Sequence, residues 1–212
     1  TVSERSLRYL DLLARQAAEL IERLRSDDAL RLSERRLSEE LADTKLLQAL
    51  SAQLIQEQGS ESLYHILVDA AMSIMHSSSA SLQVLTTERG KNELHLIASR
   101  GFSEEAVAAW EWILADAATS CAEASRRGRR VVVPDNEQCE FMKGTPDIAG
   151  YRSEGIRASQ STPLVSRSGK TLGMISTHWN DVHEPSERDF RMLDIIARQA
   201  ADLLERNQVE AA

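Results

Sequence analysis

The sequence is poor in cysteine and contains no long apolar run. Its 212 residues include two cysteines, Cys121 and Cys139, which are too few for a disulfide scaffold and are typical of a reducing cytoplasm. No apolar run approaches the roughly 18–20 residues that cross a bilayer. The first residues, TVSERSLRYLD, contain no signal-peptide core. We therefore expect a cytoplasmic protein that does not insert into membranes.

An excess of basic charge is also missing. The formal net charge is −8, whereas a nucleic-acid binder needs a surplus of lysine and arginine against phosphate. The five histidines are scattered, and no Cys-x-x-Cys or His-x-x-x-His spacing indicates a metal site. There is no glycine-rich phosphate loop and no nucleophile elbow. These absences predict a chain without a metal site, without catalytic residues and without a nucleic-acid partner.

The strongest pattern in the chain is an internal repeat. Residues 3–23 read SERSLRYLDLLARQAAELIER, and residues 186–206 read SERDFRMLDIIARQAADLLER, so that 14 of 21 positions are identical without a gap. One chain thus contains the same helix near each end. Because the second copy ends a domain, we expect the first copy to be the tail of a preceding similar domain. Thr1 stands where a start methionine would be expected, which agrees with a piece of a longer protein.

Both copies have apolar residues spaced alternately three and four apart, as in the seam of a coiled coil. A short stripe of this kind serves equally well for packing on the helix's own domain. Ser186 and Asp189 at the start of the second copy form a capping-box signal. As a dimer seam, the stripe would consist of Leu7, Leu10, Ala14, Ala17, Ile21, Leu24, Phe190, Leu193, Ala197, Ala200 and Leu204.

The segment after the first copy favours pairing. Residues 27–58 contain no proline and no glycine, and six leucines continue an apolar stripe. Residues 7–58 therefore predict one nearly continuous helix, on the order of 75 Å long. Such a helix needs a partner, and a second copy of itself is the simplest one. We expect a tail helix and coiled-coil linker over residues 1–58, a domain over residues 59–208, and a homodimer through the N- and C-terminal helices.

The domain region alternates helical and strand-like runs. After Gly59, residues 63–75 form an amphipathic helical pattern. Helical stretches are also expected over residues 104–114 and 121–127, the second ended by Gly128. Pro163 cannot donate a ladder bond, so it indicates an edge position or a bulge. The sequence predicts an α+β fold with an antiparallel sheet of five to six strands, among them residues 81–85, 94–99, 131–133, 158–165 and 172–179.

From about Leu46 to Arg206 the chain resembles a GAF domain. The resemblance is carried by RGF at 100–102, CAEA at 121–124, RRVVVPD at 129–135, and above all by QSTPLVSRSGKTLGMISTHW at 160–179 with the helix that follows. The C-terminal stretch is most similar to GAF domains of bacterial multi-sensor histidine kinases. The resemblance implies terminal helices on one face of the sheet, a ligand pocket on the other, and a parent protein whose catalytic domains are absent here.

Several activities known in the family have no signature here. The Asn-Lys-Phe-Asp-Glu signature of cyclic-nucleotide GAF domains cannot be placed. His178 is far in sequence from both cysteines, so we expect no covalent bilin, and the sequence identifies no other cofactor. Free methionine sulfoxide reductases use three cysteines on this fold, whereas this chain has two.

Eight residues are candidate ligand contacts, each with a structural alternative. Trp110 would line the pocket or the core, and Trp112, two residues along the same expected helix, would point elsewhere. Cys121 is either a buried small residue or a reactive thiol, and Asp135 either caps a turn or contacts ligand. The full set, mostly between Phe102 and the last strand, is Trp110, Cys121, Asp135, Phe141, Gln160, Ser161, Thr162 and His178.

The expected function is therefore a sensory GAF domain that binds a small molecule and passes a signal along paired helices. Two alternatives stay open. The first is a dimerisation spacer without any ligand, which a pocket too small for a fragment would favour. The second is a thiol-based sulfoxide reductase.

Overall fold

The computed structural model describes residues 15–16, 19–34, 37–38, 40–41, 44–45, 48 and 60–210, the last range without the side chains of residues 60, 209 and 210. The chain divides into two compact units, Thr1–Ala49 and Leu50–Ala212. Among the described helices, none combines the length and the apolar character needed to span a membrane.

The second unit is built on one antiparallel sheet of six strands. The strand order is β3-β2-β1-β6-β5-β4, and all five neighbouring pairs are antiparallel. The predicted sheet of five to six strands is thus confirmed. The strands are β1 (Ser79–Thr86), β2 (Glu93–Arg100), β3 (Trp112–Leu114), β4 (Val131–Val133), β5 (Ala158–Val165) and β6 (Thr171–Trp179).

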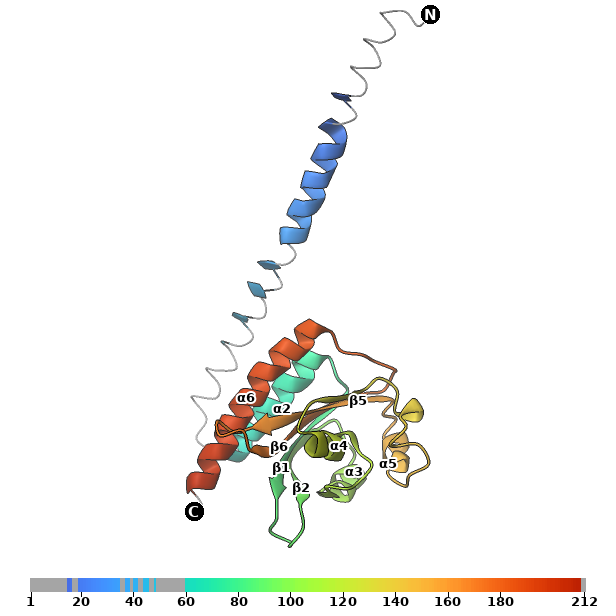
Figure 1. Cartoon of the computed structure of the whole chain (residues 1–212), viewed down its shortest axis with the longest axis vertical. Helices are drawn as coiled ribbons and strands as arrows, with labels where there is room; N and C mark the ends of the chain where they lie inside the picture. The colour runs from blue at the N-terminus through green and yellow to red at the C-terminus, as the bar shows by residue number, and fades with distance from the viewer. Residues whose placement is uncertain are drawn as a thin grey trace, which may run out of the picture. The chain divides into compact units, whose positions relative to one another are not determined.

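Helices cover both faces of this sheet. The two long helices lie side by side on one face, where they contact the central strands, and the short helices lie across the other face (Figure 1). The long helices are α2 (Ser60–Met75) and α6 (Glu187–Glu210), and the short ones are α3 (Glu104–Ala109), α4 (Ser120–Arg127), α5 (Ile148–Ser153) and the 3-10 turn η1 (Asn136–Gln138).

The ends of two helices follow from their sequences. The Asp189 carboxylate accepts hydrogen bonds from the Ser186 backbone N–H and hydroxyl at 2.8 Å, and the Ser186 hydroxyl accepts one from the Asp189 N–H at 3.2 Å. This is the reciprocal capping box that the sequence predicted for α6. Helix α4 ends at Gly128, which is left-handed with φ 61°, a conformation that costs a residue with a Cβ about 1–2 kcal/mol.

The central strands β1 and β6 have two different buried faces. Leu82 lies opposite Ile175, and both side chains are fully buried on the side of the long helices. Ser81 lies opposite Ser176 on the other face, towards the short helices. Because side chains alternate along a strand, the same two strands contact α2 and α6 on one side and the short helices on the other.

Residues 104–114 do not form one helix, so that prediction is wrong. Helix α3 ends at Ala109, and Trp112 begins β3, which pairs with β2. Trp112 stacks on the ring of His95, its partner in the register, with ring centroids 4.0 Å apart. A cross-strand ring contact of this kind stabilises a short edge strand that helix propensity alone would not predict.

Pro163 occupies an open edge, as the sequence indicated. It lies opposite Met174 of β6, but β4 ends its pairing with β5 at Ser161. Beyond Ser161 the second side of β5 has no neighbouring strand, so the missing N–H costs no ladder bond.

The predicted dimer seam has different outcomes in its two halves. Leu193, Ala197, Ala200 and Leu204 are at most 6% exposed, since α6 packs them against α2 and the sheet. For these four residues the seam assignment is corrected, because they belong to the domain's own core. Phe190 is half-buried beside Arg130, whose guanidinium lies 4.5 Å from the ring centroid.

The N-terminal half of the seam is only partly described. Residues 19–34 form a helix, and its apolar side chains are exposed, including Ile21 at 50% and Leu24 at 56%. Leu7, Leu10, Ala14 and Ala17 lie outside the described residues. An exposed apolar stripe is what a partner helix would cover, so pairing through this helix stays a prediction.

Candidate functional site

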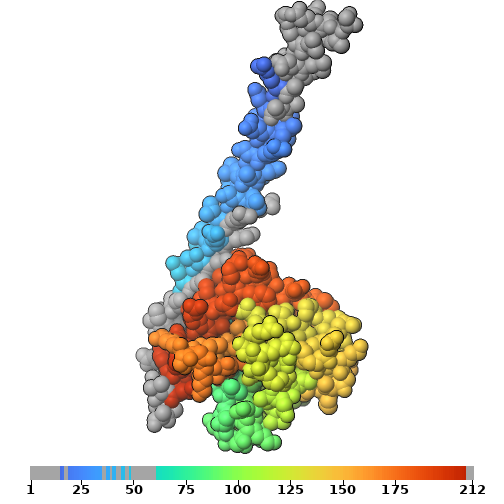
Figure 2. Space-filling view, in the orientation of Figure 1, coloured from blue at the N-terminus to red at the C-terminus, as the bar shows by residue number. Residues whose placement is uncertain are grey.

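A small pocket lies between the sheet and the short helices. Its volume is about 20 Å³, room for one or two water molecules. The space-filling view shows residues 104–153, which include α3, α4 and α5, as closely packed atoms coloured yellow-green to yellow (Figure 2). Eleven residues line the pocket: Ser81, Gln83, Leu96, Phe102, Trp110, Ile113, Thr119, Cys121, Tyr151, Ser176 and His178.

The floor of the pocket is polar and comes from β1 and β6. Ser81 and Gln83 alternate along β1, and Ser176 and His178 alternate along β6, so all four side chains share one face. A chain of buried hydroxyls supports this floor: Ser161 bonds Ser176 at 2.7 Å and Ser120, at the start of α4, at 3.0 Å. These bonds fix α4 to the central strands through groups that burial would otherwise leave unsatisfied.

Aromatic side chains form the roof. Gly101 turns the chain after β2 with φ +77°, and a Cβ there would lie 2.3 Å from the Ser78 carbonyl oxygen, so only glycine fits. This turn places Phe102 edge-on to His178 and Trp110, with centroids 5.3 and 5.4 Å away. Tyr151 of α5 closes the cluster, 5.6 Å from Trp110.

Every titratable group of the pocket is held in its neutral form at pH 7. Burial lowers the pKa of His178 to about 4, although a hydrogen bond with the Ser79 backbone acts in the opposite direction. Burial also raises the pKa of the Cys121 thiol and that of the Tyr151 hydroxyl. None of the eleven lining residues is a lysine, arginine, aspartate or glutamate. The pocket is therefore polar but uncharged.

Two atoms of the floor have no hydrogen-bond partner among the residues that the structure describes. They are the amide oxygen of Gln83 and Nδ1 of His178, on side chains that are only 2% and 6% exposed. Such an orphaned buried group costs about 1–3 kcal/mol, and native structures rarely leave one without a reason. A molecule in the pocket that forms hydrogen bonds with both atoms would remove the free-energy cost of leaving them unpaired.

The structure brings three of the eight candidate residues into the pocket and a fourth directly behind it. Trp110, Cys121 and His178 line the cavity. Ser161 lies one hydrogen bond behind Ser176. Trp110 fits against α5 because Gly150 has no side chain, since a Cβ there would lie 3.0 Å from the indole.

The other four candidates lie elsewhere. Gln160 and Thr162 point to the opposite face of the sheet, where Gln160 donates to Thr177 at 3.1 Å and accepts from Thr162 at 2.9 Å. Asp135 caps the turn η1, accepting from the Glu137 N–H at 3.0 Å, and pairs with Arg157. Phe141 packs against the core beside the short helices and lines an open groove next to β4. These four are placed away from the pocket because strand alternation and local caps determine their directions.

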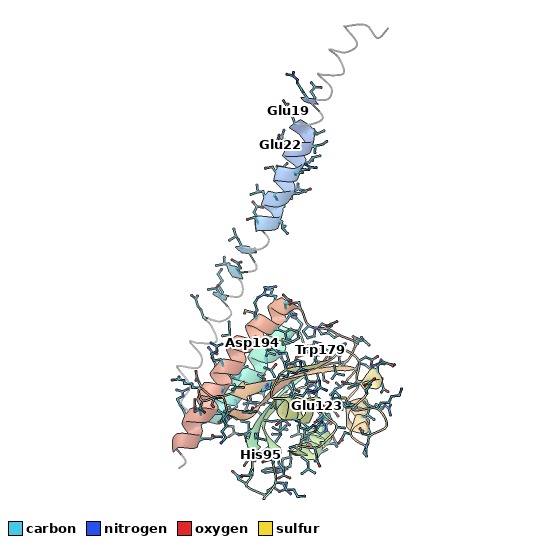
Figure 3. The ribbon with its side chains drawn as sticks, in the orientation of Figure 1. Glu19, Glu22, His95, Glu123, Trp179 and Asp194 are labelled. Atoms are coloured by element: carbon cyan, nitrogen blue, oxygen red, sulfur yellow. The ribbon has the colours of Figure 1, made fainter. Side chains whose placement is uncertain are left out.

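One side chain connects the segment just after α4 with α6. Arg130, just after α4, donates to the Thr162 hydroxyl at 2.8 Å and pairs with Asp194 of α6. Its neighbours Arg126 and Arg127 pair instead with Glu123 of α4. Figure 3 labels Glu123 and Asp194, the two carboxylates that receive these arginines. Arg130 therefore connects the segment that follows α4 directly with α6.

Sequence reasoning missed most of the pocket lining. The signal for Ser81 and Gln83 was present, because SASLQVL puts polar residues at every second position of a strand that is otherwise apolar. No local pattern marks Phe102 or Tyr151, which reach the pocket from a loop and from a short helix far apart in sequence.

The comparisons with known proteins agree with this architecture. The sequence profile of the GAF domain matches residues 57–205, which is more than half of the chain. The chain belongs to the GAF domain family. Among curated proteins, none matches it.

Several solved GAF domains and related proteins share the fold. The GAF domain of an Acinetobacter phosphoenolpyruvate-protein phosphotransferase is 14% identical over 80% of this chain and 97% of its own, with TM-score 0.66. A domain of a two-component sensor histidine kinase protein from Sinorhizobium meliloti 1021 is 22% identical over 73% of this chain and 96% of its own, with TM-score 0.58. A free methionine-R-sulfoxide reductase from Neisseria meningitidis is 16% identical over 80% and 92%, with TM-score 0.64. At these identities the likeness establishes the GAF fold alone.

Proposed function

We propose that this chain is a sensory GAF module of a cytoplasmic bacterial signalling protein, of the sensor histidine kinase type. A small molecule binds in the pocket, and the signal leaves through the terminal helices, which pair two copies of the chain. The chain itself carries no catalytic step; in this proposal the catalytic domains belong to other parts of the parent protein.

The observation that carries this proposal is that β1 and β6 face the pocket on one side and the two long helices on the other. Gln83 and Ser176 face the pocket, while Leu82 and Ile175, next to them in the same strands, pack against the long helices. A ligand that changes the spacing of the pocket face must change the packing under α6. Such a ligand shifts an equilibrium only by the difference between its affinities for the two arrangements.

The sensory role is tested by a fragment library monitored with amide NMR. A bound fragment is expected to shift the amide signals of Gln83 and Ser176 in the pocket, and also those of Ile196 on α6. Fragments that shift the pocket signals and leave the α6 signals unchanged would show that the pocket binds a ligand without transmitting a change to α6. A library in which no fragment shifts either region would contradict the proposal.

The pairing is tested by light scattering on the whole chain and on a version that starts at Leu46. The exposed apolar stripe of the N-terminal helix supports a dimer of the whole chain, and we expect a monomer after truncation. A monomer for both versions would remove the helical transmission element from the proposal.

A second candidate function has one observation in its favour. The pocket volume of about 20 Å³ is too small for a fragment unless the roof moves, as expected for a dimerisation spacer that binds nothing. The fragment library separates this candidate from the sensory one.

The sulfoxide reductase alternative is supported by the shared fold with the Neisseria meningitidis reductase. Its chemistry needs a thiolate, which forms where the pKa of the cysteine is lowered. Burial instead raises the pKa of both Cys121 and Cys139. Activity on free methionine sulfoxide that disappears in Cys121→Ala would nevertheless favour the reductase.

A further inference from the structure

The two orphaned atoms of the pocket give information about the ligand itself. The first is the Gln83 amide oxygen, and a carbonyl oxygen can only accept a hydrogen bond. The neutral ring of His178 offers Nδ1, which accepts or donates according to the tautomer. A matching ligand needs at least one N–H or O–H donor.

The register of the sheet gives the separation of these two residues along the strands. Ser79 lies opposite His178 and Gln83 lies opposite Met174, so the two residues are four positions apart along the strands, about 13 Å between backbone positions. Both side chains line the same cavity.

The absence of charge among the lining residues restricts the class further. An anion or a cation would lose its hydration in this pocket without gaining a charged partner, a cost of several kcal/mol. The rings of Phe102, Trp110 and Tyr151 offer an apolar surface for the body of the ligand.

We propose that the pocket binds a neutral molecule that donates an N–H or O–H hydrogen bond to the amide oxygen of Gln83 and places a second polar group at Nδ1 of His178. This class rests on the proposed sensory function, because it concerns the same pocket. It excludes carboxylates and phosphates as ligands.

The test uses three probes of nearly equal size on the whole chain: acetamide, acetone and acetate. Acetamide is neutral with N–H donors, acetone is neutral without donors, and acetate is an anion. Four heavy atoms permit a Kd no tighter than about 40 μM, so millimolar binding is expected, read from the amide signals of pocket residues. We expect acetamide to bind at least about tenfold more tightly than acetone or acetate.

Matched variants locate the preference. Gln83→Met is expected to bring the acetone to acetamide ratio of Kd close to one, because it removes the oxygen that accepts the N–H hydrogen bond. Gln199→Met is the control, because the Gln199 amide oxygen is also buried without a partner but does not line the pocket, and it should leave the ratio unchanged. If a pocket variant does not fold, the relative affinities of the three probes for the unchanged chain still test the proposed ligand class.

Equal binding of acetamide and acetone, tighter binding of acetate, or no shift of pocket amides by acetamide would each overturn the proposed class. The sensory function would stand after any of these results if the fragment library still finds a ligand that shifts α6. It would fail separately if no fragment did so.

Discussion

His178 should make the stability of the domain depend on pH in the mildly acidic range. Its folded pKa is about 4, lowered mainly by burial from the ordinary histidine value of 6.5. The unfolded chain therefore binds a proton at a pH where the folded chain does not, so stability is complete above pH 6.5 and is lost as the pH falls towards 4. The total effect is about 3 kcal/mol, from about 1.36 kcal/mol for each pKa unit.

The size of the loss can be worked out for intermediate pH values. With these two pKa values, linkage gives a loss of about 1.4 kcal/mol at pH 5.5 and about 2.5 kcal/mol at pH 4.5, relative to pH 7.5. No charged side chain lines the pocket with His178, and Tyr151 and Cys121 stay neutral throughout this range. Within the described part of the chain, the pocket lining therefore offers the ring no carboxylate that could compensate its protonation.

The assay is urea unfolding of the native chain and of His178→Phe at pH 4.5, 5.5, 6.5 and 7.5. Carboxylates elsewhere titrate in both proteins, so the informative quantity is the difference between the two free energies of unfolding. That difference should change in favour of the variant by the amounts above as the pH falls. A difference that is constant over the four pH values would refute the assignment of a buried neutral imidazole.

Three further predictions concern the fold around the site. Gly101→Ala should cost at least about 3 kcal/mol, because left-handed backbone strain adds to a Cβ placed 2.3 Å from a carbonyl oxygen; Gly90→Ala, with φ +78° and no atom within 4 Å, should cost only about 1 kcal/mol. Equal thermal shifts for the two variants would contradict this. A double-mutant cycle of Arg130→Met with Asp194→Asn should give a coupling of about 0.5–1 kcal/mol, measured by urea unfolding, because the pair is partly exposed. A coupling of zero would show that the two side chains do not stabilise each other. Ser186→Ala should lower stability by about 1 kcal/mol through loss of the α6 cap, and no change in the unfolding midpoint would argue against that cap.

The strands were predictable where the sequence alternates and the turn residues are unambiguous. The hairpin of β5 and β6 turns at Gly169, which has φ +84° as its place in SRSGKT suggested. Strand β3 was not predictable, since EEAVAAWEWIL has high helix propensity and only the pairing with β2 and the stack of Trp112 on His95 make it extended.

The stripe of α6 shows why pattern alone could not separate core from interface. Leu193, Ala197 and Ala200 have the spacing of a coiled-coil seam, and the nearly identical stripe of the first copy has the same spacing. In α6 the sheet and α2 cover these residues, whereas Ile21 and Leu24 in the N-terminal helix are exposed. Helical periodicity states which residues share a face and leaves open what covers that face.

The buried stripe of α6 and the contact of Arg130 with Asp194 together restrict how a signal can reach α6. The stripe that could pair α6 with a second copy is already used inside the domain, so a ligand cannot act simply by exposing it without loss of the core, at about 2–5 kcal/mol for each large residue uncovered. A smaller change is available through Arg130, which connects the end of α4 with Asp194 on the outer side of α6. We expect that opening the aromatic roof to admit a ligand moves the elements next to α4, and that this contact then shifts α6 as a rigid helix with its buried stripe intact. The outer face of α6, including the exposed Ile195, is therefore the surface on which we expect a signal to be transmitted.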